Sequence, residues 1–433
     1  MCGAASRPIV IGRATDTALP AASGLGTPWL AQPATASALS VSSGDSPVDL
    51  TIELAKPDRN AANGRYICRL TSPHAIPMDA GPHEIDLGND AKTFAKSVVD
   101  EVRARAGDVL IDTLFHALGD LVSEKLPPAV FAALRAVAQR VAPNPPAVLF
   151  VSAEPYVPWE LARIDPPLEA GRPPFLGAQT LLGRWVRDGS AAASPGVASS
   201  ATLRIEKPPT QPPATITVEN MAVMAGLYMA AAGLRRLPSA EAEAQALVKN
   251  HDGLALAASS QALKQLLDAT LERDFKRIGG AGAVHFAGHG EFDPARPDSA
   301  MMFLSDGKPL SSLLFRGTNY GPDLQPLLFL NACMIGIGGQ LLGDMGGFPG
   351  NCLRGGFGGV LGALWEVDDT IAAEIGVEFW RRALPPDGAT GEPVAAILRD
   401  LRAKYSEDAN AVPESTYLSY VYYGHPRLTL TQH

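Results

Sequence analysis

A histidine and a cysteine each stand just beyond a short apolar run, and together they could do chemistry. His289 follows the run at 284–287, and Cys333 follows the run at 327–330. Apolar runs of this length are typical of buried parallel strands, and ligands bind where such strands end. A thiolate attacks electrophilic carbon while a nearby imidazole manages its proton. The pair therefore predicts a cysteine nucleophile, Cys333, with His289 as its acid and base.

The residues around His289 favour this interpretation. Gly288 and Gly290 flank the histidine. Glycine lets backbone approach a substrate closely, and its amide N–H can point at an oxyanion. Taken alone, a cysteine after an apolar run is more often a small core residue than a nucleophile. The placement of Cys333 at the end of its strand, where the loop begins, argues for chemistry.

Other sulfur and imidazole groups have simpler explanations. His285 lies four residues before His289, but zinc ligands at that spacing need a helix and an intervening glutamate, and this segment is strand-like. We expect His285 to be a buried structural histidine. The alternative is that His285, which alternation places on the same face of the strand as His289, supports the reactive histidine. Cys68 and Cys352 are expected in the core. The sequence predicts no metal site and no cofactor.

Composition excludes several classes of protein. The chain has 433 residues and a net charge of −9, and no run of basic residues is interleaved with aromatics, so we expect no nucleic-acid partner. Four scattered cysteines without a C-x-x-C spacing suggest a reduced, cytoplasmic protein. The longest apolar stretch, 221–234, is shorter than a membrane span and contains two glycines, which predicts no membrane segment.

Strand-like and helix-like segments alternate along the chain, which predicts an α/β fold with a mostly parallel sheet covered by helices on both faces. We expect strands near 48–54, 65–70, 146–152, 221–228, 283–287, 327–330, 358–365 and 420, a hairpin within 301–314, and helices over 94–102, 109–124, 128–141, 240–249, 260–275, 370–384 and 393–405. Composition shifts predict a flexible leader over 1–46, an α/β domain over 47–190, a linker over 191–215 and a second domain over 216–433.

Several motifs in the second half occur in the order of a known family. They are HFAGHG at 285–290, FLNAC at 329–333, LWEVDD at 364–369 and YGHPRL at 423–428. With these motifs the chain resembles CHAT domain proteins, which are relatives of caspases and separase. The histidine precedes the cysteine by a distance similar to that in caspases. The segment PWEL at 158–161 resembles the region upstream of many such domains.

The resemblance implies a caspase-like protease domain preceded by a degenerate pseudo-caspase half. Cys333 would be the nucleophile and His289 the acid and base, while the N–H groups of Gly290 and Cys333 would stabilise the oxyanion. One departure is that Met334 and Ile335 follow the cysteine where the family commonly has Glu-Ser. This change leaves the two reactive residues in place and suggests altered specificity or regulation, with reduced activity as the lesser alternative.

Asp368 and Asp369 have two readings. An aspartate just before a helix is a good N-cap, and a helix is expected from residue 370. By resemblance to separase, Asp369, with Asp368 beside it, would line a pocket for a basic residue before the cut. Both readings stay open at this stage.

The sequence thus predicts a cysteine endopeptidase, and the resemblance implies that it cleaves a protein partner after a basic residue. The resemblance implies a bacterial defence or cell-death pathway and activation by a partner protein. The alternative is a non-catalytic CHAT scaffold that acts as an interaction module, against which the intact His289 and Cys333 count.

Overall fold

The computed structural model describes residues 47–57, 61, 63–152, 154, 157–186, 211–228, 234–293, 296–318, 320, 324–332, 339–341, 344–405 and 414–432. All of them belong to one compact unit, Gly44–His433. The predicted leader, most of the predicted linker and Cys333 lie outside the described residues.

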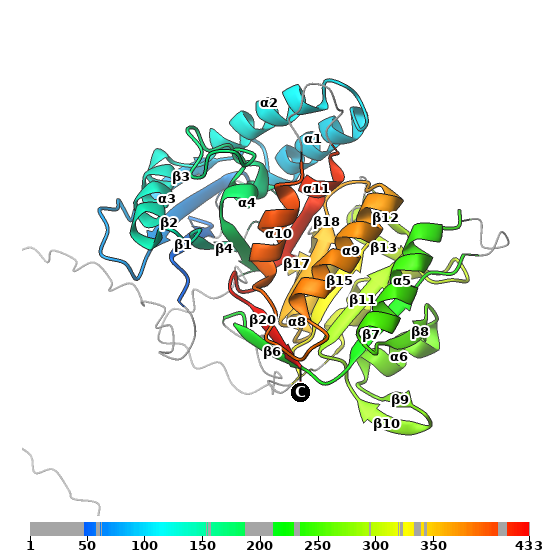
Figure 1. The fold of residues 1–433 in the computed structure, drawn as a ribbon. Coiled ribbons are helices and arrows are strands. Elements are labelled where there is room, and N and C mark those ends of the chain that lie inside the picture. Colours follow the sequence, from blue (N-terminus) through cyan, green and yellow to red (C-terminus); the bar gives the residue numbers. More distant parts are fainter. Residues whose placement is uncertain are drawn as a thin grey trace, which may run out of the picture. The chain divides into compact units, whose positions relative to one another are not determined.

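An eleven-stranded sheet runs through the molecule (Figure 1). Its strands, in spatial order, are β3 (His83–Asp86), β2 (Arg65–Thr71), β1 (Leu50–Ala55), β4 (Ala147–Ser152), β5 (Leu181–Val186), β19 (Tyr420–Tyr423), β18 (Gly359–Ala363), β15 (Leu327–Asn331), β11 (Ala283–Ala287), β7 (Met221–Ala225) and β8 (Leu254–Ala257). Within this sheet, the antiparallel neighbours are β3–β2, β2–β1 and β19–β18. The prediction of a mostly parallel α/β sheet is confirmed.

Both predicted domains contribute strands to this sheet. The segment 47–190 supplies β1 to β5, and the segment 216–433 supplies the other strands. The junction is the pair β5–β19, in which Arg184 lies opposite Tyr423. The placement of a domain boundary between the two segments stays a prediction.

Three helices follow the first strands, and their ends have local causes. They are α1 (Ala91–Ala104), α2 (Ile111–Ser123) and α3 (Pro128–Val141). The Asp90 carboxylate caps α1 by accepting from the amide of Thr93 over 2.7 Å. Pro128 opens α3, where a missing N–H costs nothing. The predicted helix over 128–141 is confirmed at both ends.

Helices cover both faces of the sheet strands that the segment 216–433 supplies. The larger ones are α5 (Pro238–Asn250), α6 (Ser260–Leu267), α8 (Gly347–Arg354), α9 (Asp369–Ala383) and α10 (Val394–Arg402). Helices α5, α9 and α10 lie across one face (Figure 1). Side chains alternate along β11, so Val284 and Phe286 pack with α6 and α8, whereas Ala283 packs on the face of α5 and α9.

One predicted helix is wrong in its second half. The helix expected over 260–275 ends at Leu267, and a hairpin of β9 (Leu271–Arg273) and β10 (Lys276–Gly279) follows. Leucines continue at helical spacing into β9, which is why the pattern misleads. Ala269 has a φ of 52°, which α-helix does not allow, and Phe275 at the hairpin turn has a φ of 61°.

Smaller elements complete the described part of the chain. They are β6 (Thr215–Val218), β12 (Gly290–Asp293), β13 (Arg296–Phe303), β14 (Pro309–Ser311), β16 (Gly339–Leu341), β17 (Asp344–Gly346), β20 (Thr429–Gln432), a 3-10 turn (Trp159–Leu161), α4 (Leu176–Gln179), α7 (Leu313–Arg316) and α11 (Thr416–Ser419). The predicted hairpin within 301–314 corresponds to β13 and β14. Among the described helices, none has the length and apolar character needed to cross a bilayer.

Candidate active site

The carboxyl ends of β11 and β15 lie side by side. The two strands are parallel, and their register places Ala287 opposite Asn331. The amide of Gly288 donates to the carbonyl oxygen of Asn331 over 3.3 Å, so the pairing continues beyond β11. His289 comes two residues after Ala287, and Cys333 comes two residues after Asn331 in the sequence. The predicted base therefore follows one of two neighbouring strand ends, and the predicted nucleophile follows the other.

The backbone of His289 is held by Tyr228 and Phe303. The His289 amide donates to the Tyr228 hydroxyl oxygen over 2.8 Å, and that hydroxyl donates to the Phe303 carbonyl over 2.9 Å. The Phe303 amide donates back to the His289 carbonyl over 3.1 Å. Burial raises the pKa of Tyr228 to about 12, so its hydroxyl stays protonated at neutral pH. These bonds fix the backbone that carries the imidazole.

The imidazole itself is oriented by a backbone carbonyl. Its Nε2 atom lies 2.6 Å from the carbonyl oxygen of Arg235, just before α5. Because a carbonyl can only accept, Nε2 must carry the hydrogen, and in the neutral ring Nδ1 keeps the lone pair. Sequence reasoning could not find this group because every residue carries a carbonyl and Arg235 lies 54 positions upstream.

Gly290 lies directly beside the histidine. It begins β12 and pairs with Met302 of β13 in an antiparallel ladder. Its N–H is one of the two predicted oxyanion donors, and the structure places it at the edge that carries His289. The other donor, the N–H of Cys333, lies outside the described residues.

Asp368 and Asp369 lie beyond the carboxyl end of β18, the strand next to β15. Asp368 is the N-cap of α9 and accepts from the amides of Thr370 and Ile371 at 2.9 and 3.0 Å. Asp369 is partly exposed, and its Oδ2 accepts from the Ser239 amide over 3.1 Å. Among the described residues, Oδ1 of Asp369 has no hydrogen-bond partner. Asp368 thus has a capping role, while Asp369 keeps one free carboxylate oxygen.

A cluster of buried polar side chains lies beneath this edge. We call it the polar cluster; its members are Glu243 of α5, His285 of β11, Asn331 of β15, Trp380 of α9 and Tyr420 of β19. The expectation that His285 is buried is confirmed, because its exposure is 0%. Sequence reasoning gave the other members no role: Asn331 lies within the FLNAC motif, and the rest come from distant segments that form no motif with it.

The thiols that the structure describes are unreactive because they are buried. Burial raises the pKa of Cys68 to about 12 and that of Cys352 well above its ordinary value. Both were expected in the core, and both are buried. The described residues contain no group of three or more histidine, cysteine, aspartate or glutamate side chains that could hold a metal ion.

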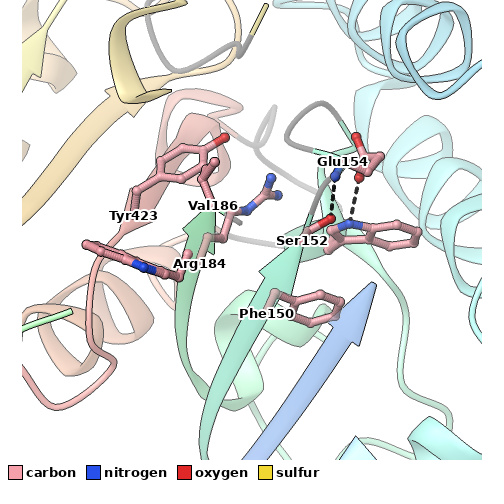
Figure 2. Close-up of a pocket in the computed structure, with 8 residues that line it drawn as sticks. Phe150, Ser152, Glu154, Arg184, Val186 and Tyr423 are labelled. Carbon is pink, nitrogen blue, oxygen red and sulfur yellow. Dashed lines mark hydrogen bonds between the residues drawn. The ribbon is translucent and has the colours of Figure 1, made fainter. Parts of the chain in front are cut away.

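The strands of the segment 47–190 have an edge comparable to the one that carries His289, at the point where β4 and β5 end. Figure 2 shows a small pocket there. Its lining residues are Phe150, Ser152, Glu154, Trp159, Arg184, Trp185, Val186 and Tyr423. Arg184 donates through Nε to Glu160 over 2.8 Å and through Nη2 to the same carboxylate. Burial alone lowers the pKa of Arg184, but attraction to Glu160 outweighs it and leaves that pKa above its usual value.

The Glu154 carboxylate is also satisfied, because it accepts from the Trp159 indole over 3.1 Å (Figure 2) and from the Val157 amide over 2.7 Å. Among the residues that line this pocket, none is a cysteine or a histidine. The described lining of this pocket therefore has charge and hydrogen bonds but no thiol or imidazole.

Comparison with known proteins found no match among curated sequences. Several solved structures are similar to this chain. The Saccharomyces cerevisiae separase–securin complex has 12% identity and a TM-score of 0.45, over 89% of this chain but 30% of that one. The Arg-specific cysteine proteinase gingipain R has 14% identity and a TM-score of 0.41, over 71% and 70% of the two chains.

Caspase-1 from Spodoptera frugiperda has 12% identity and a TM-score of 0.31, over 54% of this chain and 96% of that one. The CHAT domain family matches residues 131–423, which is more than half of the chain and spans both sheet edges described above. The resemblance predicted from the motifs is confirmed, and this chain belongs to the CHAT domain family.

Proposed function

We propose that this chain is a cysteine endopeptidase in which Cys333 is the nucleophile and His289 the acid and base. The register of β11 and β15 carries the proposal, because it sets Ala287 opposite Asn331 and each predicted catalytic residue follows its strand by two positions. The orientation of the His289 ring by the Arg235 carbonyl adds support, since that hydrogen bond leaves Nδ1 free to act as a base.

The reaction follows from these roles. Nδ1 of His289 accepts the proton of Cys333 Sγ as the sulfur attacks the scissile carbonyl carbon. The resulting oxyanion is stabilised by backbone N–H donors, with Gly290 as one of them. His289 then gives its proton to the leaving amine, the C–N bond breaks, and a thioester remains. Water, deprotonated by His289, cleaves the thioester and restores the thiol.

We further propose that the protein cuts after a basic residue. The support is Asp369, whose Oδ1 lacks a hydrogen-bond partner among the described residues, at the sheet edge that carries His289. A carboxylate and a guanidinium can form a bidentate pair that is stronger than a neutral hydrogen bond. A basic side chain is therefore the natural complement of this site.

The setting of the activity is a proposal drawn from the family. We propose a protein substrate, an activating protein partner, a bacterial defence or cell-death pathway and a cytoplasmic location. In this view residues 47–190 are a degenerate caspase-like domain without chemistry, 191–215 are a linker and 216–433 are the protease domain. The absence of a thiol or imidazole among the residues lining the pocket of Figure 2 supports the division of labour.

An active-site label tests the proposal. The probe is a peptidyl acyloxymethyl ketone with arginine at the residue before the reactive carbon, and mass spectrometry locates the adduct. We expect one adduct, on Cys333, in the wild type and in Cys352→Ala, and none in Cys333→Ala. A fluorogenic peptide library then gives the preference before the cut. Residual peptidase activity in Cys333→Ala would overturn the assignment of the nucleophile, and an unlabelled wild type that cleaves nothing would favour the scaffold alternative.

A further inference from the structure

The polar cluster has a feature that packing alone does not explain: it joins β11 at its middle residue and β15 at its last residue to helices α5 and α9. Its side chains are almost completely shielded, with exposures between 0 and 6%. A buried polar group destabilises a fold unless it is hydrogen-bonded. The contacts of each member therefore show what the cluster holds in place.

Asn331, the last residue of β15, uses its whole carboxamide. Its Nδ2 donates to Glu243 Oε1 over 2.8 Å and to the Ala372 carbonyl of α9 over 2.9 Å. Its Oδ1 accepts from the Tyr420 hydroxyl over 2.5 Å. Its main-chain carbonyl accepts from Gly288, the residue before His289. Asn331 thus connects the end of β15 with α5, with α9 and with the start of the His289 loop.

His285 has a defined tautomer and no charge. Its Nδ1 accepts from the Trp380 indole over 3.0 Å, and because an indole only donates, Nδ1 must carry the lone pair. The hydrogen is therefore on Nε2, which lies 3.0 Å from Glu243 Oε1 but outside hydrogen-bond alignment. No cation faces Glu243 from this strand.

Glu243 is therefore a buried acid whose neighbours in the polar cluster are an imidazole and an amide. Burial raises the pKa of Glu243; the nearby His285 ring and the Asn331 amide oppose this shift, and the like charge of Asp369 on α9 adds to it. Space for the carboxyl exists because residue 376 of α9 is glycine: a Cβ there would overlap Glu243 Oε1. Apolar residues would fill this position at lower cost.

We propose that Glu243 and Asn331 are positioning residues of the protease, which hold the His289 and Cys333 loops in register through the ends of β11 and β15. The inference rests on the proposed function. Neither residue touches the substrate: Glu243 acts through Asn331, and Asn331 acts through the strand ends. A small displacement of two reacting groups costs a large factor in rate, because the rate depends on their alignment.

The first test is Glu243→Gln, which keeps the shape of the side chain but removes its charge and replaces one of its two acceptor oxygens by an NH2 donor. With a fluorogenic arginine peptide, we expect kcat to fall by about 10- to 100-fold and KM to change less than about twofold. Alkylation of Cys333 by iodoacetamide, followed by mass spectrometry, should slow in parallel. The matched control is Glu160→Gln, another buried glutamate at the other sheet edge, which should lower the melting temperature and leave kcat unchanged.

The second test is rescue. Asn331→Asp places two carboxyl groups together and should lose at least as much kcat as Glu243→Gln. Adding Glu243→Gln to Asn331→Asp restores a donor opposite an acceptor, and we expect at least about tenfold recovery of kcat. Gly376→Ala, which displaces the Glu243 carboxyl without altering a polar group, should reproduce the kcat loss if Glu243→Gln is poorly soluble.

Two results separate the possible failures. If Glu243→Gln and Gly376→Ala lower only the melting temperature, to the extent that Glu160→Gln does, while kcat stays at the wild-type value, the positioning role is overturned and the protease remains. If wild-type Cys333 is alkylated no faster than an ordinary exposed thiol, and Cys333→Ala changes no activity, the proposed function itself fails, and the positioning role fails with it.

Discussion

The molecule has two comparable sheet edges, and each holds a buried glutamate by different contacts. At the ends of β4 and β5, the buried charge of Glu160 is neutralised directly by Arg184. At the ends of β11 and β15, Glu243 is equally buried but contacts an amide and a neutral imidazole. The first arrangement is complete in itself. The second leaves a partly exposed histidine, His289, at the rim.

The difference shows what the edge of the proposed active site has and the other edge lacks. Charge, burial and aromatic packing are present at both edges, and Phe150 stacks on Trp159 at the first with ring centroids 5.8 Å apart. The second edge adds an imidazole whose Nδ1 has no hydrogen-bond partner in the described part of the chain and whose ring is oriented by a carbonyl. A partly exposed imidazole on a fixed backbone, and not the fold alone, distinguishes the two.

The largest expected effect concerns the reactive pair. His289→Ala and Cys333→Ala should each lower kcat/KM by at least about 10³-fold, and the double variant should lose no more than either, because nucleophile and base act as one unit. Peptide hydrolysis by purified proteins gives the values. Ser152→Ala, at the end of β4, is the matched control and should keep kcat/KM within about twofold. Activity lost in Ser152→Ala would contradict the assignment of chemistry to one edge.

The next effect belongs to the first edge and concerns stability. Glu160→Ala leaves the Arg184 guanidinium buried without its acid, and we expect the free energy of unfolding to fall by about 3–5 kcal/mol. Urea unfolding followed by fluorescence measures it. Cys333 in the folded fraction should be alkylated by iodoacetamide at the wild-type rate. A slower alkylation with unchanged stability would mean that the first edge takes part in the reaction.

Local patterns predicted the parts of the site that rest on strand ends. The runs at 284–287 and 327–330 are short, apolar and followed by small residues, so β11 and β15 and the placement of His289 could be read directly. The family followed from motifs in fixed order. Cys333 as nucleophile, and the pocket role of Asp369, stay predictions.

The missed features depend on contacts between distant segments. Asn331 and Glu243 are 88 positions apart, and neither neighbourhood forms a pattern that pairs them. The group of Arg235 that contacts His289 is a backbone carbonyl, which the sequence does not distinguish from any other carbonyl. A helix is wrongly expected at 271–275 because the spacing of leucines carries no information on the backbone φ angles. The positive φ values of Asp274 and Phe275 belong to a hairpin turn.

A further prediction asks whether the second edge also selects the substrate. Asp369→Asn removes the charge that would meet a basic side chain and should lower kcat/KM for arginine peptides by about 100-fold, the scale of a lost charged contact. Alkylation of Cys333 by small neutral iodoacetamide should hardly change. If the main role of Asp369 is its bond to the Ser239 amide, asparagine substitutes well and cleavage stays near the wild-type rate.

The smallest effect concerns the hydroxyl that fixes the His289 backbone. Tyr228→Phe keeps the ring, whose centroid lies 4.7 Å from that of His289, but removes the acceptor of the His289 amide and the donor to Phe303. A buried group left without its partner costs about 1–3 kcal/mol, and we expect about a tenfold fall in kcat.

Burial raises the pKa of Tyr228 to about 12, above the ordinary tyrosine value, so the hydroxyl is neutral throughout pH 6–9. The pH profile of Tyr228→Phe between pH 6 and 9 should therefore keep the wild-type shape at a lower plateau. Tyr66→Phe, at the far side of the sheet on β2, is the control and should leave kcat unchanged. A shifted profile in Tyr228→Phe would show that this hydroxyl does more than hold the His289 backbone in position.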